Sequence, residues 1–248
     1  MLATAIDRDY GARARVVGLV DQDRTRAAAL AARLRSRPVV TTLAHLIRLS
    51  HLVIEAAGVL AAPRVARLGL AAHRDVLIMS AGGLLSQASS WSRLAQRSRG
   101  TLYVPSGALC GLDGIKAMAG TIRRLRLTTR KPPLALGITT PLRAPKLLFQ
   151  GSPADAIKRF PQNTNVAATM MLAATLSGGR RPASTVRVIA DPALKANTHE
   201  LEVDSESGTL RVQVQSRPST SNPKTSELAI RSALATLRQV LAPVRVGT

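Results

Sequence analysis

Cysteine, aromatic residues and acidic residues are all scarce in this sequence. The chain of 248 residues has one cysteine, Cys110, so an internal disulfide is excluded and a cytoplasmic protein is expected. Aromatic residues make up 2% of the chain, which leaves little surface for stacking on nucleic-acid bases. No apolar run approaches the roughly 20 residues that span a bilayer, and the start of the chain lacks the pattern of a secretory signal. A membrane partner is therefore not expected.

The shortage of acidic residues leaves a large positive charge. Lys and Arg number 35 against 14 Asp and Glu, a formal net charge of +21. A basic surface attracts nucleic acid and other polyanions. The basic residues are spread along the whole chain, however, and no zinc-finger or aromatic RNA-binding motif accompanies them. We do not expect nucleic acid as the partner, and the histidines show no metal-ligand spacing, so no metal site is predicted.

The first part of the chain alternates short apolar segments with helix-forming segments rich in Ala, Leu and Arg. Short apolar strands joined by helices are typical of a parallel sheet covered on both faces. The expected strands are residues 14–23, 38–42, 51–58, 75–83 and 101–107, and the expected helices are residues 24–36, 60–73 and 86–98. We therefore expect an α/β domain of the Rossmann type over residues 1–105.

The pattern changes after Ser106. Strands with alternating polarity are expected at 122–133, 146–151, 184–192, 199–205 and 208–218, and helices at 152–160, 165–176 and 225–241. This combination predicts a second, α+β domain with a mostly antiparallel sheet over residues 106–248. The last helix, 225–241, is a candidate to pack back on the first domain.

A dinucleotide-binding fold begins with a strand and a turn of the form G-x-G-x-x-G, and neither is found here. The first residues, "LATAIDRDYG", instead suggest the end of the first helix. The missing strand is central in such a sheet, so its absence would leave two strand edges unpaired. We therefore expect a sheet truncated at its N-terminal side, with the natural chain beginning upstream of Met1.

Asp21 ends the first expected strand, where an acid usually accepts the ribose hydroxyls of NAD. Arg24 and Arg26 follow and could instead meet the 2′-phosphate of NADP. Asp21 and Asp23 could also simply begin the next helix, where acidic residues are favoured by the helix dipole. The sequence leaves the choice between NAD and NADP open.

Five later motifs occur in a characteristic order. They are "VPSGALCGLDGIKA" (104–117), "LTTRKPP" (127–133), "FQGSPADAIKRFPQNTNVAATMMLA" (149–173), "ADPALKANTHELEV" (190–203) and "SRPSTSNPKTSELA" (216–229). Together they resemble the bacterial and archaeal L-aspartate dehydrogenases, from about Val16 to about Leu237. The resemblance implies NAD(P)-dependent oxidation of L-aspartate to iminosuccinate, which hydrolyses to oxaloacetate and ammonia or feeds NAD biosynthesis. It also implies a homo-oligomer.

His199 is the expected catalytic residue. Its motif, Asn197-Thr198-His199-Glu200, resembles the active-site segment of that family, and an imidazole can take up and return a proton near neutrality. Without the resemblance, a single histidine at a strand edge would more often be a surface residue. Because side chains alternate along a strand, Glu200 should point away from His199, and Asp191 is the preferred orienting partner.

The resemblance assigns Ala108 and Asn165 to the cofactor, although Asn165 could equally be a helix N-cap. Ala57 and Ser80 lie at the carboxyl ends of strands, where α/β sheets bind ligands. Amides at Gly107 and Ala108 could be exposed at the start of a helix capped by Ser106, and Cys110 is expected in the core. The expected substrate-binding residues are Lys131, Lys224, Thr225 and Asn163.

Two alternatives to an aspartate dehydrogenase remain open. One is a catalytically inactive Rossmann-type relic, or a basic interaction protein, which cofactor binding would exclude. The other is a dehydrogenase of the same two-domain type that acts on another amino acid or imine, which a substrate profile would reveal.

Overall fold

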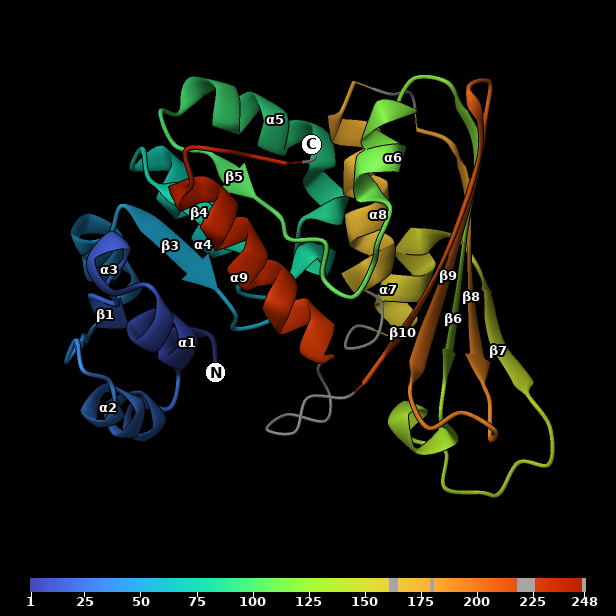
Figure 1. Ribbon diagram of the computed structural model, residues 1–248, viewed down its shortest axis with the longest axis horizontal. Coiled ribbons are helices and arrows are strands. Elements are labelled where there is room, and N and C mark those ends of the chain that lie inside the picture. The colour runs from blue at the N-terminus through green and yellow to red at the C-terminus, as the bar shows by residue number, and fades with distance from the viewer. Residues whose placement is uncertain (161–164, 179–180, 218–225, 247–248) are drawn as a thin grey trace. The chain divides into compact units, whose positions relative to one another are not determined.

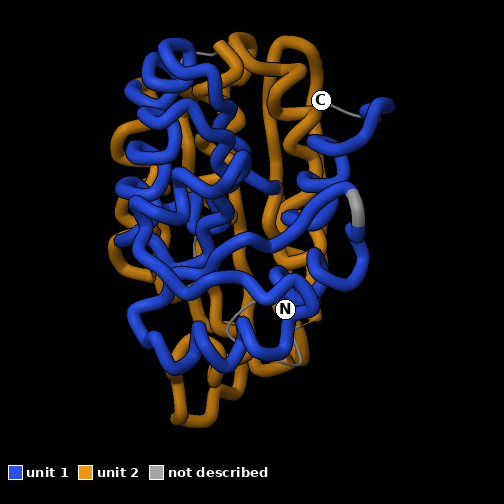
Figure 2. The backbone as a smooth tube through the Cα atoms, turned by 90° about the vertical axis from the view of Figure 1, so that its left-hand side faces the viewer, with its two compact units in different colours: residues 1–83, 90–105, 233–245 blue, residues 84–89, 106–232, 246–248 orange. Residues whose placement is uncertain are grey.

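The computed structural model describes residues 1–160, 165–178, 181–217 and 226–246. It divides into two compact units (Figures 1 and 2). Unit 1 comprises Met1–Gly83, Ser90–Pro105 and Ala233–Arg245, and the main part of unit 2 is Ser106–Ser232, joined by Leu84–Ser89. Each unit has its own sheet and core, so each is described by itself.

Unit 1 is built from short parallel strands connected by helices. The strands are β1 (Gly18–Leu19), β2 (Val39–Val40), β3 (Leu52–Glu55), β4 (Asp75–Ile78) and β5 (Leu102–Tyr103). The helices are α1 (Leu2–Asp9), α2 (Arg24–Arg33), α3 (Leu43–Leu49), α4 (Ala62–Ala71) and α5 (Ala88–Arg97). Parallel strands require such helical crossovers, and the Rossmann-type α/β arrangement predicted from the sequence is confirmed.

The strands of unit 1 form two separate sheets, β1-β2 and β3-β4-β5. No strand of the described chain pairs β1 with β3. An apolar cluster contains Val16 before β1 and Leu52 and Ile54 of β3, together with Ile6 and Tyr10 of the N-terminal segment. The same cluster includes Leu234, Leu237 and Leu241 of α9 (Glu227–Leu241), so the second half of this helix packs against α1 within unit 1.

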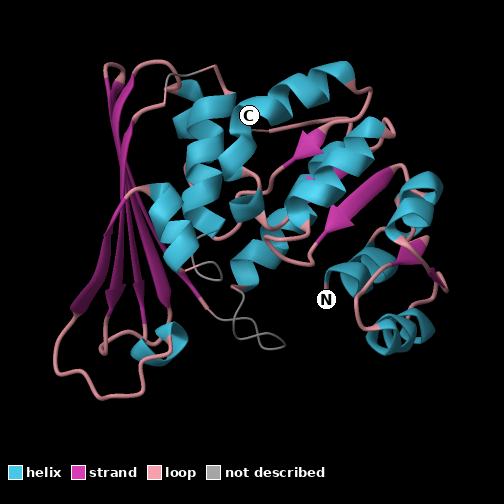
Figure 3. Cartoon of the chain, turned by 180° about the vertical axis from the view of Figure 1, so that it is seen from behind, coloured by secondary structure: helices cyan, strands magenta, loops and turns pink. Residues whose placement is uncertain are grey.

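Unit 2 contains a five-stranded sheet of order β10-β9-β6-β8-β7, which Figure 3 shows from behind. Its strands are β6 (Ile122–Lys131), β7 (Lys146–Gly151), β8 (Ala183–Ala190), β9 (Asn197–Ser205) and β10 (Gly208–Ser216). Only β6 and β8 run parallel, and every other neighbouring pair is antiparallel. The predicted α+β organisation is confirmed.

Helices α6 (Leu112–Ala117), α7 (Pro153–Arg159) and α8 (Asn165–Leu176) cover one face of this sheet (Figure 1). Alternate residues of the strands point toward them, and the core includes Leu125 and Leu127 of β6 and Leu201 and Val203 of β9. The apolar helix α8 contributes most of the helical surface that packs against this face of the sheet, because nearly its whole length is buried. No described helix is both long enough and apolar enough to cross a membrane.

One helix begins later than the sequence suggests. The expected start near Ser106 is a turn instead, in which the Ser106 carbonyl accepts from the Leu109 N–H at 3.2 Å. Gly107 has φ +65° and Gly111 has φ +81°, a left-handed backbone that interrupts a helix. Helix α6 therefore starts at Leu112, after Gly111.

Truncation of a core residue of β9 tests this packing. Leu201 is 1% exposed, whereas Leu134 is 77% exposed. Leu201→Ala should lower the free energy of unfolding by about 2–5 kcal/mol, because it leaves a cavity, while Leu134→Ala should change it by less than about 0.5 kcal/mol. Urea denaturation of both variants measures the difference, and equal effects would contradict the assigned core.

Candidate active site

His199 lies where the apolar inner face of the unit 2 sheet becomes polar. It precedes Leu201 and Val203 on the same face of β9. In the antiparallel pairing of β6 with β9, His199 is directly opposite Thr129. Lys131 lies two residues after Thr129 on β6, so its side chain points to the same face of the sheet. The sheet register therefore brings His199, Thr129 and Lys131 together at the carboxyl end of β6.

All three side chains are buried: His199 is 3% exposed, Thr129 1% and Lys131 6%. The Nδ1 atom of His199 is 3.1 Å from the Thr129 hydroxyl, and Thr129 is the one hydrogen-bond partner of the ring within the described part of the chain. Burial, together with the nearby Lys131 ammonium, lowers the pKa of His199 from 6.5 to about 4. The imidazole is thus neutral at physiological pH.

Lys131 is the only buried lysine among the described residues. Its burial lowers the pKa of the ammonium from 10.5 to about 8, because the charged form loses solvation. At neutral pH the group still carries most of its charge. A buried cation beside a neutral imidazole is suited to a carboxylate-bearing ligand, since an anion would stabilise the ammonium.

The opposite face of the sheet carries ion pairs. Glu200 points away from His199, as predicted, and accepts from the Arg130 Nε at 3.1 Å. The expectation that Asp191 orients His199 is wrong, because the Asp191 carboxylate accepts from the Ala193 N–H at 3.0 Å and lies 4.0 Å from the Arg130 Nη1. Thr129, which the sequence analysis missed, takes the position beside the ring.

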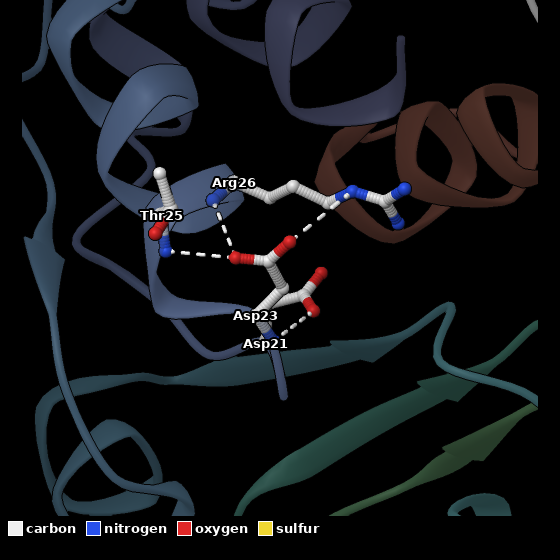
Figure 4. Close-up of polar contacts among 4 residues, drawn as sticks. All are labelled: Asp21, Asp23, Thr25 and Arg26. Carbon is white, nitrogen blue, oxygen red and sulfur yellow. Dashed lines mark hydrogen bonds and ion pairs between the residues drawn. The ribbon is translucent and has the colours of Figure 1, made fainter.

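Asp21 and Asp23 follow β1 in unit 1 (Figure 4). Asp23 is the N-cap of α2, and its Oδ1 accepts from the N–H groups of Thr25 and Arg26. The Arg26 Nε lies 3.6 Å from the Asp23 carboxylate. One oxygen of Asp21 accepts from the Asp23 N–H at 2.9 Å, and its other oxygen has no partner among the described residues. Asp21 is exposed and can accept hydrogen bonds from a ligand.

Ala57 and Ser80 meet at the carboxyl ends of β3 and β4 through Glu55. The Glu55 Oε1 accepts from the Ala57 N–H at 2.7 Å and from the Ser80 hydroxyl at 3.0 Å. The Glu55 Oε2 accepts from the Ser80 N–H at 3.1 Å. These donors are therefore occupied, and Ala57 and Ser80 can offer a ligand only acceptors, namely their carbonyl oxygens and the Ser80 hydroxyl oxygen, and apolar surface.

Ala108 and Asn165 both belong to unit 2. Ala108 is 6% exposed and packs in the core, and the neighbouring Gly107 N–H donates to the Ser232 hydroxyl at 3.0 Å. The exposed amide expected at Gly107 is thus occupied. Asn165 is the first residue of α8, where its carbonyl accepts from the Thr169 hydroxyl at 3.0 Å. Cys110 is exposed, so its expected place in the core is wrong; the left-handed Gly111 beside it ends the buried segment.

Three expected substrate-binding residues, Asn163, Lys224 and Thr225, lie outside the described residues. Among the residues that are described, no group of three His, Cys, Asp or Glu side chains is placed to hold a metal ion. The described site residues thus form two sets, one around His199 in unit 2 and one at the strand ends of unit 1.

Comparison with known protein families assigns each half of the chain. Residues 113–240 match the family model "Aspartate dehydrogenase, C-terminal". Residues 2–105 match the model "Homoserine dehydrogenase, NAD binding domain". The two matches meet close to the boundary between Pro105 and Ser106 that separates the two compact units.

Individual relatives agree. The chain is 43% identical over 227 residues to the L-aspartate dehydrogenase of Methanosarcina barkeri, covering 86% of this chain and 82% of the relative. It is 40% identical to that of Methanocella arvoryzae, covering 100% of this chain and 94% of the relative. The crystal structure of aspartate dehydrogenase from Thermotoga maritima superposes with a TM-score of 0.67 at 27% identity, covering 79% of this chain and 78% of that one.

The buried charge of Lys131 should cost stability in a pH-dependent way. The unfolded chain, with a lysine pKa of 10.5, binds more protons than the folded chain between pH 8 and 10.5, so this cost falls as the pH rises through that window. Lys131→Met should therefore raise the free energy of unfolding at pH 7, by up to about 3 kcal/mol, with a gain that vanishes near pH 10.5.

Urea denaturation at pH 7, 9 and 10.5 measures this effect. Lys146→Met, at an exposed lysine of β7 in the same sheet, is the matched control and should show no such dependence. A Lys131→Met variant that is no more stable than the parent at pH 7 would refute the buried-charge assignment.

Proposed function

The chain belongs to the L-aspartate dehydrogenase family, and on this basis we propose that it oxidises L-aspartate to iminosuccinate with NAD or NADP. The observation that supports this best is the buried set of His199, Thr129 and Lys131, in which a neutral base and a cation lie together. Aspartate presents an amine that must lose a proton and two carboxylates that need cationic partners. The set offers a base for the amine and a cation for one of the two carboxylates.

We assign His199 as the general base. Its Nδ1 faces Thr129, so a tautomer with the proton on Nδ1 donates to the Thr129 hydroxyl and leaves the Nε2 lone pair for the substrate amine. Because His199 has a pKa of about 4, its ring is unprotonated throughout the neutral and alkaline range. Lys131 then binds a substrate carboxylate, whose negative charge raises the pKa of the ammonium again.

The strand ends of unit 1 fit a dinucleotide in part. Asp21 has an open carboxylate oxygen at the end of β1, which suits a ribose hydroxyl. Ala57 and Ser80 lie at the ends of the next sheet, and Ala108 and Asn165 are the proposed contacts in unit 2. A dinucleotide held by these residues would supply the acceptor for the hydride on the substrate Cα. Asn163, Lys224 and Thr225 are retained as proposed substrate contacts.

Two further properties belong to this proposal. The face of the unit 2 sheet opposite α6, α7 and α8 carries no helix in the described chain (Figure 3), and it includes the ion pairs Arg126–Glu202 and Arg130–Glu200. We propose that a second copy of the chain covers this face in a homo-oligomer. We also propose that the protein works in the cytoplasm, where its substrate and cofactor are found.

Replacement of the base tests the chemistry. With L-aspartate and NAD or NADP, absorbance at 340 nm should rise, and His199→Asn should lower kcat by about 10²–10⁴-fold, the usual contribution of a general base. Cofactor affinity should be unchanged. His45→Asn, at an exposed histidine of unit 1, should retain full activity. A faster reaction with another amino acid would favour a related dehydrogenase, and an active His199→Asn variant would refute the assigned base.

Asp21 should set the choice of cofactor. A free carboxylate accepts from the ribose hydroxyls of NAD and repels the 2′-phosphate of NADP, so the protein should prefer NAD. Asp21→Ala should shift the ratio of kcat/KM values toward NADP by at least about tenfold. Asp23→Asn removes a neighbouring charge but keeps a good N-cap, and it should leave the ratio unchanged. A parent protein that prefers NADP would contradict this role.

A further inference from the structure

Glu55, the last residue of β3, is a buried carboxylate outside the proposed chemistry. It is 2% exposed and accepts four hydrogen bonds. Three reach Oε1, from the N–H groups of Ala57 at 2.7 Å and Gly58 at 2.8 Å and from the Ser80 hydroxyl at 3.0 Å. The fourth joins Oε2 to the Ser80 N–H at 3.1 Å. No lysine or arginine pairs with it among the described residues.

These contacts connect two loops that leave the same sheet edge. Because β3 and β4 are parallel neighbours, the segments that follow them emerge side by side. The Glu55 carbonyl also accepts from the Met79 N–H at 3.0 Å. Gly58 has φ +115°, a backbone conformation that residues with a side chain rarely adopt. In this conformation the N–H groups of Gly58 and Ala57 both donate to the Glu55 Oε1. The loop after β3 is thus folded around the carboxylate.

A buried carboxylate can only accept hydrogen bonds, and leaving a buried N–H without a partner costs free energy. The hydrogen bonds of Glu55 therefore form only when both loops adopt this conformation, and the N–H groups of both loops depend on Glu55 as their acceptor. The two loops carry Ala57 and Ser80, the proposed cofactor contacts of unit 1. Their geometry depends on one side chain that lies beneath them.

We propose that Glu55 is a positioning residue that holds the loops after β3 and β4 in the conformation that receives the dinucleotide. It sets cofactor affinity and takes no part in proton or hydride transfer. This inference rests on the proposed function, because it takes the dinucleotide to bind at these strand ends.

Glu55→Gln tests the proposal with little change in size. The amide oxygen can still accept from Ala57, Gly58 and the Ser80 hydroxyl, but its NH₂ group then faces the Ser80 N–H, which loses its acceptor. The KM and Kd for the dinucleotide should rise by about tenfold or more, while kcat and the KM for aspartate stay within about twofold. Ser80→Ala, which removes only the hydroxyl contact, should shift the same constants by a smaller factor.

Asp75→Asn is the matched control. The Asp75 carboxylate accepts from the Thr101 N–H at 2.7 Å and connects β4 to β5 at the amino edge of the same sheet. It should lower thermal stability without changing dinucleotide affinity. If Glu55→Gln leaves dinucleotide affinity unchanged, or changes it no more than Asp75→Asn does, the proposal is overturned.

Calorimetric titration with NAD separates this inference from the proposed function, because binding needs no turnover. A parent protein that binds NAD but does not oxidise aspartate would overturn the proposed function alone, and the comparison of Kd values would still decide the role of Glu55. A parent protein that binds neither NAD nor NADP would overturn both.

Discussion

The pairing of β6 with β9 places Thr129 opposite His199, and the proposed chemistry depends on this register. A slip of one residue would send His199 to the outer face of the sheet, because side chains alternate along a strand. Apolar residues on the same face of the two strands favour the observed register, because this register buries all of them. They are Leu125 and Leu127 on β6 and Leu201 and Val203 on β9. The core thus orients the imidazole that we propose as the base, and the burial that stabilises the sheet also keeps this ring neutral.

Acidic side chains are few in this chain, and in unit 1 most of them bind the main chain. Asp7, Asp21, Asp23, Glu55 and Asp75 each accept from at least one backbone N–H. The two backbone N–H groups and the Ser36 side chain that contact Asp7 lower the pKa of that carboxyl. These carboxylates thus serve to define helix starts and loops.

Local patterns in the sequence were sufficient for the two kinds of sheet and for most helices, and a motif that resembles a known family singled out His199 as the proposed base. They were not sufficient for Thr129 or for the hydrogen bonds that Glu55 makes. Thr129 becomes a neighbour of His199 only through a strand register that spans 70 residues, and no local pattern encodes that pairing. The preference for Asp191 failed because Arg130 and the Ala193 N–H compete for its carboxylate. The late start of α6 depends on the positive φ values of Gly107 and Gly111, which the sequence alone does not reveal.

The most direct test of the central claim is an NMR titration of the histidine side chains. The chain has four histidines, so the His199 signal can be assigned by its loss in His199→Asn. The account predicts a pKa near 4 for this ring, with the proton on Nδ1 above that pH. A His199 that titrates near 6.5, as an exposed histidine does, or that carries its proton on Nε2, would contradict a buried neutral base held by Thr129.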